Sequence, residues 1–439
     1  MSQATPGKTS AGGVQAGLAG GRRSASVLPA MASPAEAIEA MRECVRSVPS
    51  ETVPVDRAAG RVLVDAIRAD RDSPAADVSA MDGYAVRIGE LAAAVERGDE
   101  LPVAFEVETG CVPPALPRDR GARVFTGGVV PEGADAVVRR EDTAESPTSL
   151  RWRGDALPEA GANIRRRGEN ATRGDVLVAP GCVVGSPEMA VLSSVSVSTL
   201  SVARRVRVTI IVTGNEVAPP ADDNAAEADA PGRPRNSNGP MLATLFGQAA
   251  WCGVVANLHV PDDGDATAEA IARAASDADA VVTTGGVSMG DHDHVPAALA
   301  SLGAEIVYHH LAMRPGKPNL GAILPSGVPV IGLPGNPVSV AVGGVVLVGP
   351  ILRGLAGLTR ARHRAVVSTD GEPDAQPTRP LPLWHYPLVR VDPAGTARRL
   401  PSRGSGDVPS LGRCDGFVEL PPGQTIESNR CRWFGWSID

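Results

Sequence analysis

The clearest pattern in the chain is an alternation of apolar runs and amphipathic stretches between residues 204 and 352. The runs "VRVTIIVTG" and "VVTTGG" predict buried strands, and "SNGPMLATLFGQAAWCG" and "DATAEAIARAASDADA" have the spacing of helices. "VVANLHV", "EIVYHHLAM" and "VPVIGLPG" predict three further strands. Strands that alternate with helices indicate a doubly wound α/β domain with a parallel sheet, whose ligand site lies beyond the carboxyl ends of the strands.

Apolar spacing and turn residues also organise the chain on either side of this domain. Ser33, Pro34 and Glu36 predict a capped helix at the start of "SPAEAIEAMRECV". Short apolar runs from about residue 85 to 180 predict a β-rich domain, and a helix-like stretch follows at about 186–194. The expected order is a disordered leader (1–30), a helical and linker domain (31–66 with 173–200), a β-rich insertion (67–172), the α/β domain (201–352) and a C-terminal β domain (353–439).

Composition and charge narrow the class of protein. A net charge of −8 argues against nucleic acid as the main partner, because binding to a phosphate backbone needs a basic surface. The leader has no unbroken apolar stretch of signal-peptide length. The most apolar run, 338–352, is shorter than the ~20 residues of a membrane span and predicts a buried helix. Six scattered cysteines without a CxxC pair fit reduced thiols, so we expect a cytoplasmic protein with no membrane partner.

Five loops at the expected carboxyl edge of the sheet carry candidate chemistry. They are "TGNE" (213–216), "PDD" (261–263), "GGVSMGDHD" (285–293), "RPGKP" (314–318) and "LPGNPVS" (333–339). Consecutive glycines let backbone N–H groups turn towards an anion, and Arg314 and Lys317 add full positive charges. Glu216, Asp262 and Asp293 are carboxylates suited to a divalent cation beside phosphate. Together the loops predict a phosphorylated ligand handled with a hard ion such as Mg²⁺.

Each of these loops also has a purely structural interpretation. A Gly-Gly or Pro-Gly-Asn-Pro sequence is typical of a turn, and Asp262 or Asp263 can cap the helix that follows. His292 and His294 lie in a loop, where histidines are more often surface residues than metal ligands. The convergence of five such loops on one sheet edge favours a ligand site over this interpretation.

Lys317 is distinctive in this chain. Lys8 is the only other lysine, and the remaining 40 of the 42 basic positions are arginine. A chain with this bias would lose a lysine easily wherever a generic positive charge was enough. The retained lysine therefore indicates a need for a compact ammonium group on a flexible stem.

Eight motifs resemble those of the molybdopterin molybdenumtransferases, the family that includes the C-terminal catalytic region of gephyrin. They follow the family's order: "SAMDGYAVR", "TGGVVPEGADAVVRRED", "RRRGEN", "VTGNEV", "NSNGPML", "TTGGVSMGDHD", "RPGKP" and "LPGNPVS". The resemblance implies an elongated subunit with a helical segment, a β-rich insertion, an α/β domain and a β-barrel-like tail. It also implies a homodimer whose active site lies between the α/β domain of one chain and the insertion of the other. The implied reaction takes adenylylated molybdopterin and molybdate, releases AMP with Mg²⁺, and forms molybdenum cofactor.

The same resemblance assigns roles to individual residues. Asp82 and Thr126 match the partner-side residues of the cleft, and Glu216, Asp262 and Asp293 match acidic residues that are the expected metal ligands. The expected catalytic residues are Asp82, Thr126, Glu216, Asp262, Asp293 and Lys317. The expected substrate-binding residues are Gly285, Gly286, Ser288, Arg314, Pro334, Gly335, Asn336, Pro337, His385 and Ser405.

Several positions depart from the family pattern. They are Asn170 and Asn215 in place of aspartate, His310 in place of a lysine found in some members, Arg314 in place of the first lysine of the usual "KPGKP", and His385, with Arg390 nearby, in place of an oxyanion-binding arginine. Loss of that arginine would weaken molybdate capture, because histidine is largely neutral at pH 7.

Three functions remain open from the sequence. The first is a molybdopterin molybdenumtransferase. The second is a divergent paralogue that keeps the fold but acts on another phosphorylated or nucleotide substrate, as the departures would allow. The third is a dimeric scaffold, which the retained phosphate-loop residues argue against as the sole role.

Overall fold

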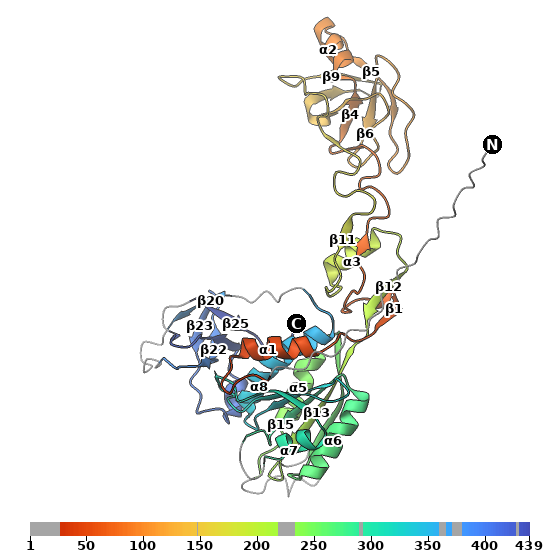
Figure 1. The fold of residues 1–439 in the computed structure, drawn as a ribbon. Helices are drawn as coiled ribbons and strands as arrows, with labels where there is room; N and C mark the ends of the chain where they lie inside the picture. Colours follow the sequence, from red (N-terminus) through yellow and green to blue (C-terminus); the bar gives the residue numbers. More distant parts are fainter. Residues whose placement is uncertain are drawn as a thin grey trace, which may run out of the picture. The chain divides into compact units, whose positions relative to one another are not determined.

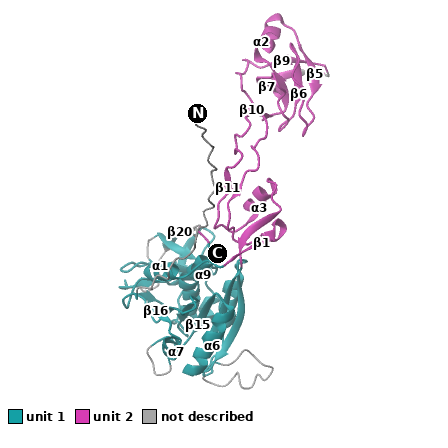
Figure 2. Cartoon of the chain, turned by 45° about the vertical axis from the view of Figure 1, so that its right-hand side comes forward, with its two compact units in different colours: residues 1–48, 205–357, 361–439 teal, residues 49–204, 358–360 magenta. Residues whose placement is uncertain are grey.

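The computed structural model describes residues 27–146, 148–217, 233–288, 293–359, 366–370, 380–426 and 430–439. The chain divides into two compact units, coloured separately in Figure 2. Unit 1 comprises residues 1–48, 205–357 and 361–439, and unit 2 comprises residues 49–204 and 358–360. Three parts of the chain singled out in the sequence lie outside the described residues: the expected leader as far as residue 26, residues 221–232 of the acidic, Pro/Ala-rich stretch "ADDNAAEADAPGRPR" (221–235), and His292.

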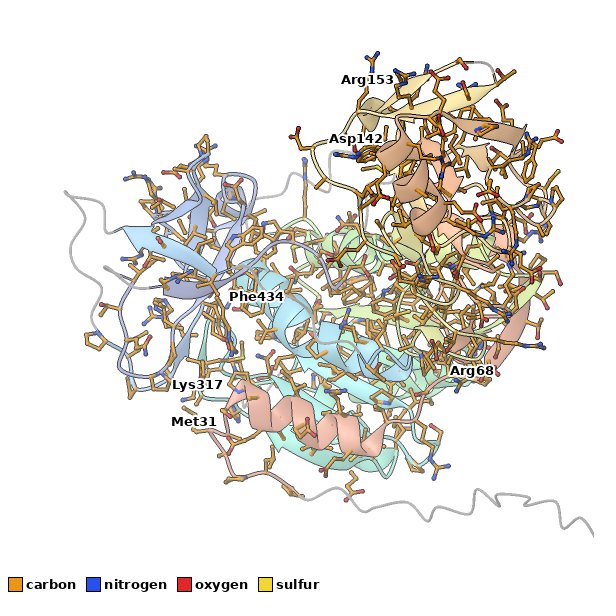
Figure 3. All side chains as sticks on the ribbon, turned by 90° about the horizontal axis from the view of Figure 1, so that it is seen from above. Met31, Arg68, Asp142, Arg153, Lys317 and Phe434 are labelled. Carbon is orange, nitrogen blue, oxygen red and sulfur yellow. The ribbon has the colours of Figure 1, made fainter. Side chains whose placement is uncertain are left out.

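The β-rich part of unit 2 is a sheet with the strand order β7-β4-β6-β5-β9-β8. Its elements are β4 (Gly83–Val86), α2 (Ile88–Arg97), β5 (Leu101–Glu106), β6 (Gly121–Val124), β7 (Ala136–Arg139), η2 (Arg140–Asp142), β8 (Thr143–Glu145) and β9 (Ser149–Trp152). Tyr84, Leu91 and Leu150 are buried between the sheet and α2. At the β8–β9 hairpin, Arg153 donates its N–H to the carbonyl of Asp142 (2.8 Å; both labelled in Figure 3).

The remainder of unit 2 consists of three short strand pairs. The pair β3 (Val78–Ser79) with β10 (Ile164–Arg165) adjoins the β-rich sheet, where Ile164 packs on a core cluster that includes Ala85 and Val124. The pairs β1 (Ser50–Pro54) with β12 (Thr199–Ala203) and β2 (Ile67–Arg68) with β11 (Val176–Val178) surround a separate small core. The short helix η1 (Val55–Arg57) follows β1, and α3 (Ser186–Ser193) confirms the helix expected at about 186–194. Leu63, Cys182 and Leu192 lie in this core.

The α/β sheet of unit 1 has the strand order β14-β13-β15-β19-β18-β16. The strands are β13 (Val206–Thr213), β14 (Cys252–Val260), β15 (Ala280–Thr284), β16 (Glu305–His309), β18 (Leu320–Ile323) and β19 (Pro329–Leu333). Helices α6 (Gly264–Asp277) and α7 (Val295–Ser301) pack together, whereas α5 (Asn238–Gly247) contacts β14 and α8 (Figure 1). Every residue of β15 and β19 is buried, which explains their continuous apolar runs.

This sheet is mixed, whereas the sequence pattern predicts a parallel one. Strands β14, β13, β15 and β19 are parallel, but β18 runs antiparallel to both β19 and β16. The expectation omitted β18, because it is only four residues long and contains Gly321. That glycine has a tertiary reason: a Cβ at residue 321 would lie 2.2 Å from a ring carbon of Tyr308 on β16.

The apolar run after β19 forms one continuous helical segment in the core. It consists of α8 (Pro337–Gly343), the π-helical turn η3 (Gly344–Val348) and α9 (Gly349–Leu355). By length and composition the segment Pro337–Leu355 could cross a membrane, but 83% of its most apolar window is buried inside the protein. Its apolar character is therefore accounted for by core packing, as the sequence predicts.

Helix α1 (Pro34–Cys44) packs on α9 and on β16 and β18, and so belongs to unit 1 (Figure 1). The capping box expected from the sequence is confirmed: Ser33 Oγ accepts the N–H of Glu36, whose carboxylate accepts the N–H of Ser33. The sequence predicts one domain made of residues 31–66 and 173–200, which would group α1 with segments that belong to unit 2. The contacts divide the chain at residue 48 instead, because Ala37 and Met41 bury their side chains in unit 1. Leu28 lies within the leader predicted for residues 1–30, yet it donates its N–H to the carbonyl of Val307 on β16 (2.8 Å). The end of the predicted leader is therefore bound to unit 1.

The C-terminal part of unit 1 is a barrel closed by β20-β23-β22-β24-β25. Its elements are β20 (Val366–Asp370), β22 (Leu388–Val391), β23 (Thr396–Arg399), α10 (Val408–Leu411), β24 (Gly416–Glu419) and β25 (Arg430–Phe434). Phe434, labelled in Figure 3, stacks on Phe417 with ring centroids 4.9 Å apart. A short parallel pair, β17 (Met313–Arg314) with β21 (Trp384–His385), joins the α/β domain to the barrel.

Candidate functional site

The loops at the carboxyl edge of the α/β sheet enclose a cavity of about 790 Å³, here called the acidic cavity. Three of the expected carboxylate residues, Glu216, Asp262 and Asp293, line it. It is also lined by the expected residues Gly285, Gly286, Gly335, Asn336 and Pro337. The "TGNE", "PDD", "GGVSMGDHD" and "LPGNPVS" loops therefore meet at one site. They do so because β13, β14, β15 and β19 are parallel and end at the same edge.

Gly285 explains why the loop after β15 begins with glycine. Its φ is +89°, in the left-handed region that favours glycine. A Cβ there would lie 2.8 Å from Thr213 Oγ1 and 2.9 Å from the carbonyl oxygen of Thr213. The loop after β15 can therefore approach the end of β13 this closely only with glycine at residue 285.

Asn215 and Asp262 join two of the loops. Asn215 donates its N–H to Asp262 Oδ2 (2.9 Å), and Asp262 donates its N–H to Asn215 Oδ1 (3.1 Å). Asn215, which replaces an expected aspartate, thus accepts the same kind of backbone hydrogen bond that a carboxylate would accept. An asparagine can therefore make this contact between the loops, and it carries no negative charge beside Asp262.

Two buried polar atoms in the acidic cavity lack partners within the described part of the chain. Asn238 donates its amide Nδ2 to the carbonyl of Gly335 (2.7 Å), which leaves Asn238 Oδ1 as an unpaired acceptor. Thr284 Oγ1 is buried and unpaired as well. Buried polar atoms are costly when unpaired, so both are places where a ligand would form hydrogen bonds. The sequence reasoning assigned no role to either residue, although "NSNGPML" contains Asn238.

A second cavity of about 500 Å³, the basic cavity, lies between the α/β domain and the barrel of unit 1. It is lined by the expected residues Arg314, Lys317, Pro334, Asn336, His385 and Ser405. The single crevice expected from the sequence is therefore two cavities, and Asn336 lines both. They are separate because Arg314 and Lys317 follow β16 by way of β17, which pairs with β21 and not with the parallel strands.

Backbone hydrogen bonds hold the walls of the basic cavity together. Tyr386 donates its N–H to Arg314 O (2.8 Å), and Val338 at the start of α8 donates its N–H to Ser405 O (2.9 Å). Gly316, at φ +102°, lies next to the buried side chain of Asn319, which donates to the Gly316 carbonyl. Lys317, labelled in Figure 3, accepts the N–H of Leu311 at its carbonyl oxygen (2.8 Å), which closes the loop.

His385 lies between positive charges in the basic cavity. Burial, reinforced by Arg314 and then by Arg399, lowers the pKa of His385 to about 4. The imidazole is therefore neutral at pH 7 and adds no positive charge to the cavity. The positive charge comes from Arg314, Lys317 and Arg399, and the described lining residues include no carboxylate.

Arg399 is the cation of the basic cavity that the sequence did not predict. It lies at the end of β23, whereas Arg390, the neighbour considered from the sequence, lies on β22 opposite Arg398 and does not line the cavity. No local signal distinguishes Arg399 in "TARRLPSRG", where it is one of three arginines. Its position becomes evident only when the barrel closes beside the "RPGKP" loop.

Asp82 and Thr126, the two residues predicted for the partner side of the cleft, lie together in unit 2. Thr126 donates both its N–H and its hydroxyl to Asp82 Oδ1, each at 2.8 Å. These two hydrogen bonds, and then Arg140 and Arg123, lower the pKa of Asp82. The carboxylate is therefore ionised at neutral pH and held in one orientation.

Three other positions singled out in the sequence lie outside both cavities. Ser288 is exposed and does not line either cavity. Asn170 lies in unit 2, where its side chain bonds Arg165 and Ser73. His310 has φ +65° and stacks on His309, with ring centroids 4.2 Å apart. Burial, His309 and Lys317 lower its pKa, so His310 does not supply the positive charge of the lysine it replaces.

Comparison with known proteins agrees with this architecture. The family model described as "MoeA N-terminal region (domain I and II)" matches residues 32–196, and that described as "Probable molybdopterin binding domain" matches residues 209–354. A molybdopterin molybdenumtransferase of Synechococcus elongatus is 35% identical over 382 residues, which cover 85% of this chain and 91% of that protein. One of Staphylococcus aureus is 31% identical over 394 residues, covering 88% of this chain and 91% of that protein. A crystal structure of the moeA molybdopterin biosynthesis protein from Pyrococcus horikoshii has a TM-score of 0.75 at 25% identity, covering 92% of this chain and 99% of that one.

The α/β domain, its two cavities and these similarities define the class of protein: a transferase of molybdenum cofactor biosynthesis. Within that class, the chain belongs to the molybdopterin molybdenumtransferase family. The resemblance drawn from the sequence motifs is thereby confirmed.

Proposed function

We propose that this protein inserts molybdenum from molybdate into adenylylated molybdopterin, with Mg²⁺-dependent release of AMP, in the cytoplasm. The observation that carries the proposal is the pairing of the two cavities along residues 334–337, with Asn336 common to both. One cavity is lined by carboxylates, and the other by cations that have no carboxylate partner among the described residues. A reaction that breaks a phosphate anhydride beside a bound metal oxyanion needs both environments next to each other.

The basic cavity suits molybdate as substrate. Arg314, Lys317 and Arg399 supply positive charge, and Ser339, Ser402 and Ser405 supply hydroxyl groups. A tetrahedral oxyanion is held best by several donors at fixed positions. In this assignment, the cations bind the oxyanion and offset its charge as it approaches the molybdopterin sulfurs.

The acidic cavity suits the adenylyl group and a magnesium ion. Its carboxylates provide oxygen ligands, the donors Mg²⁺ prefers, and one or two of Glu216, Asp262 and Asp293 would hold the ion. Within the described residues, no three Asp, Glu, His or Cys side chains form a metal site by themselves. This fits Mg²⁺, which usually takes one or two carboxylates and completes its shell with water and substrate phosphate. When bound, the ion would neutralise charge on the phosphates.

Asp82 and Thr126 are assigned to the partner side of the active site. Their paired geometry presents an oriented, ionised carboxylate at the surface of unit 2. We propose that the functional form is a homodimer. In it, the Asp82 carboxylate of one subunit faces the two cavities of the other subunit and orients the ligand bound there.

The test is AMP release from adenylylated molybdopterin by the purified full-length protein. We expect release that requires both molybdate and Mg²⁺, and loss of at least about 100-fold in Lys317→Ala, because one preorganised charged donor is removed. Arg398→Ala, which changes an exposed arginine paired with Asp392, is the matched control. No AMP release from intact, demonstrably bound substrate would contradict the proposal.

Two observations favour a second function, that of a divergent paralogue with another phosphorylated substrate. His385 is neutral where the family has an arginine, and Asn215 removes a charge beside Asp262. Under this alternative, the gene would fail to restore molybdoenzyme activity in a strain that lacks its own transferase. Asn215→Asp and His385→Arg would then restore little, whereas under the first proposal the unmodified gene complements the strain.

A further inference from the structure

The basic cavity contains three cations that nothing in the described structure neutralises. Arg314, Lys317 and Arg399 have no carboxylate partner among the described residues, and no Asp or Glu lines the cavity with them. Like charges gathered in one cavity repel each other, and water screens them less there than on an open surface. Such an arrangement is stable when an anion supplies the missing negative charge.

Arg399 differs from its neighbour on the same strand. Along β23 the side chains alternate, so Ala397 is fully buried while Arg398 is exposed and ion-paired with Asp392 at 3.7 Å. Arg399, the next residue, is half-buried and lines the basic cavity. The register Val389–Arg399 and the hydrogen bond from Leu400 N–H to Leu388 O hold the strand end in place. Of Arg398 and Arg399 on this strand of the barrel, therefore, only Arg399 lines the basic cavity.

The "RPGKP" loop delivers the other two cations from the α/β domain. The β17–β21 pairing places Arg314 opposite His385, and the carbonyl of Arg314 accepts the N–H of Tyr386. The walls from the two domains of unit 1 thus hold their charges at set positions across one cavity. Two cations balance a dianion in formal charge, and a third makes the site favour a dianion strongly over a monoanion of the same shape.

We propose that Arg399 is the third anion-binding cation of the basic cavity and makes it selective for tetrahedral dianions over tetrahedral monoanions. This inference rests on the proposed function only for the identity of the natural anion, molybdate. Arg399 donates charge-assisted hydrogen bonds directly to the oxyanion. Its guanidinium supplies a positive charge that His385, uncharged at neutral pH, does not supply.

Calorimetric titration of molybdate into the full-length protein, without molybdopterin, tests the proposal. We expect Arg399→Gln to weaken molybdate binding about 10- to 100-fold, as loss of a hydrogen bond to a charged group does. Arg398→Gln removes the same charge one residue away and should stay within about twofold of the unmodified protein. Perchlorate, a tetrahedral monoanion, should bind at least about tenfold more weakly than molybdate, and this preference should shrink in Arg399→Gln.

Each contrary result overturns the inference. It fails if Arg399→Gln binds molybdate normally, if Arg398→Gln loses as much affinity, if perchlorate binds as well as molybdate, or if the unmodified protein binds no molybdate. Thermal unfolding establishes whether each variant is folded. If Arg399→Gln does not fold, Arg399→Lys replaces it, with an expected loss of about three- to tenfold because an ammonium cannot donate two parallel bonds. Unchanged affinity in that variant also overturns the inference. Selective molybdate binding without AMP release would refute the proposed reaction and leave the role of Arg399 intact.

Discussion

At the scale of single residues, Lys317 is the feature that sequence bias made conspicuous. It lines the basic cavity with two arginines, in a chain that otherwise uses arginine almost throughout. Gly316 and the buried Asn319 hold its loop in one conformation. The position therefore offers space and orientation for an ammonium next to two bulkier guanidinium groups.

Lys317→Arg tests whether the basic cavity requires a compact ammonium group at this position. Lys317→Arg keeps the charge but replaces a compact ammonium by a planar group, so molybdate-dependent AMP release should fall by about tenfold, equivalent to about 1.4 kcal/mol. Lys317→Ala should fall further. The measurement is the steady-state rate of AMP release at saturating substrate. A Lys317→Arg variant with full activity would mean that the lysine was retained by chance.

His385 supports a prediction about stability and pH. Its pKa in the folded protein is lowered to about 4 from an ordinary value of 6.5. Because the unfolded chain then takes up a proton that the folded protein refuses, this residue's contribution to stability is complete above pH 6.5 and is lost as the pH falls towards 4. Denaturant titrations measure the free energy of unfolding. Between pH 7 and pH 4 it should fall by about 2–3 kcal/mol less in His385→Gln than in the unmodified protein. Parallel pH profiles of the two proteins would refute the lowered pKa.

At the scale of elements, the loops after the parallel strands owe their positions to close backbone approaches. Gly285 on the loop after β15 lies against Thr213 at the end of β13, and no larger residue fits without displacement. The sequence shows this glycine as one of a Gly-Gly pair. Only the neighbouring strand shows why a side chain at residue 285 would be costly.

We therefore predict that Gly285→Ala destabilises the fold by about 1–3 kcal/mol, since its φ is +89° and the added methyl would contact a backbone carbonyl. Gly264→Ala at the start of α6 is the matched control, because a Cβ there meets no atom within 4 Å and should not reduce stability. Denaturant unfolding of both variants is the measurement. Equal stability of the two variants would show that the loop relaxes at no cost.

At the scale of the whole molecule, the candidate residues fall into two compact units. Asp82 and Thr126 belong to unit 2, and the residues of both cavities belong to unit 1. The proposed homodimer brings unit 2 of one chain to unit 1 of the other. That arrangement makes a prediction that a single-chain active site does not make.

We predict that two inactive variants complement each other when mixed. Asp82→Ala and Lys317→Ala damage opposite sides of the shared site, so a mixed dimer contains one intact site. After subunit exchange at equal concentrations, half of the dimers are mixed, and activity should recover to about one quarter of the unmodified protein. Asp82→Ala mixed with Thr126→Ala, both on the same side, is the control and should stay inactive. No recovery after verified exchange would place the whole site within one chain.

The sequence by itself determined the local structure and the chemical inventory of this protein. The capping box at Ser33 and Glu36, the parallel strands with their helices, and the glycine and acidic loops all depend on neighbouring residues, so periodicity and motif spacing revealed them. The family followed from the same local motifs.

Only the tertiary structure decided how those parts combine. The antiparallel strand β18, the packing of α1 on unit 1, the separation of the acidic from the basic cavity, and the choice of Arg399 over Arg390 and Arg398 depend on contacts between residues far apart in the chain. A short strand or one arginine among several has no local signature. Its position is determined by strand pairing and barrel closure, which bring distant segments together through packing and hydrogen bonds that no sequence window contains.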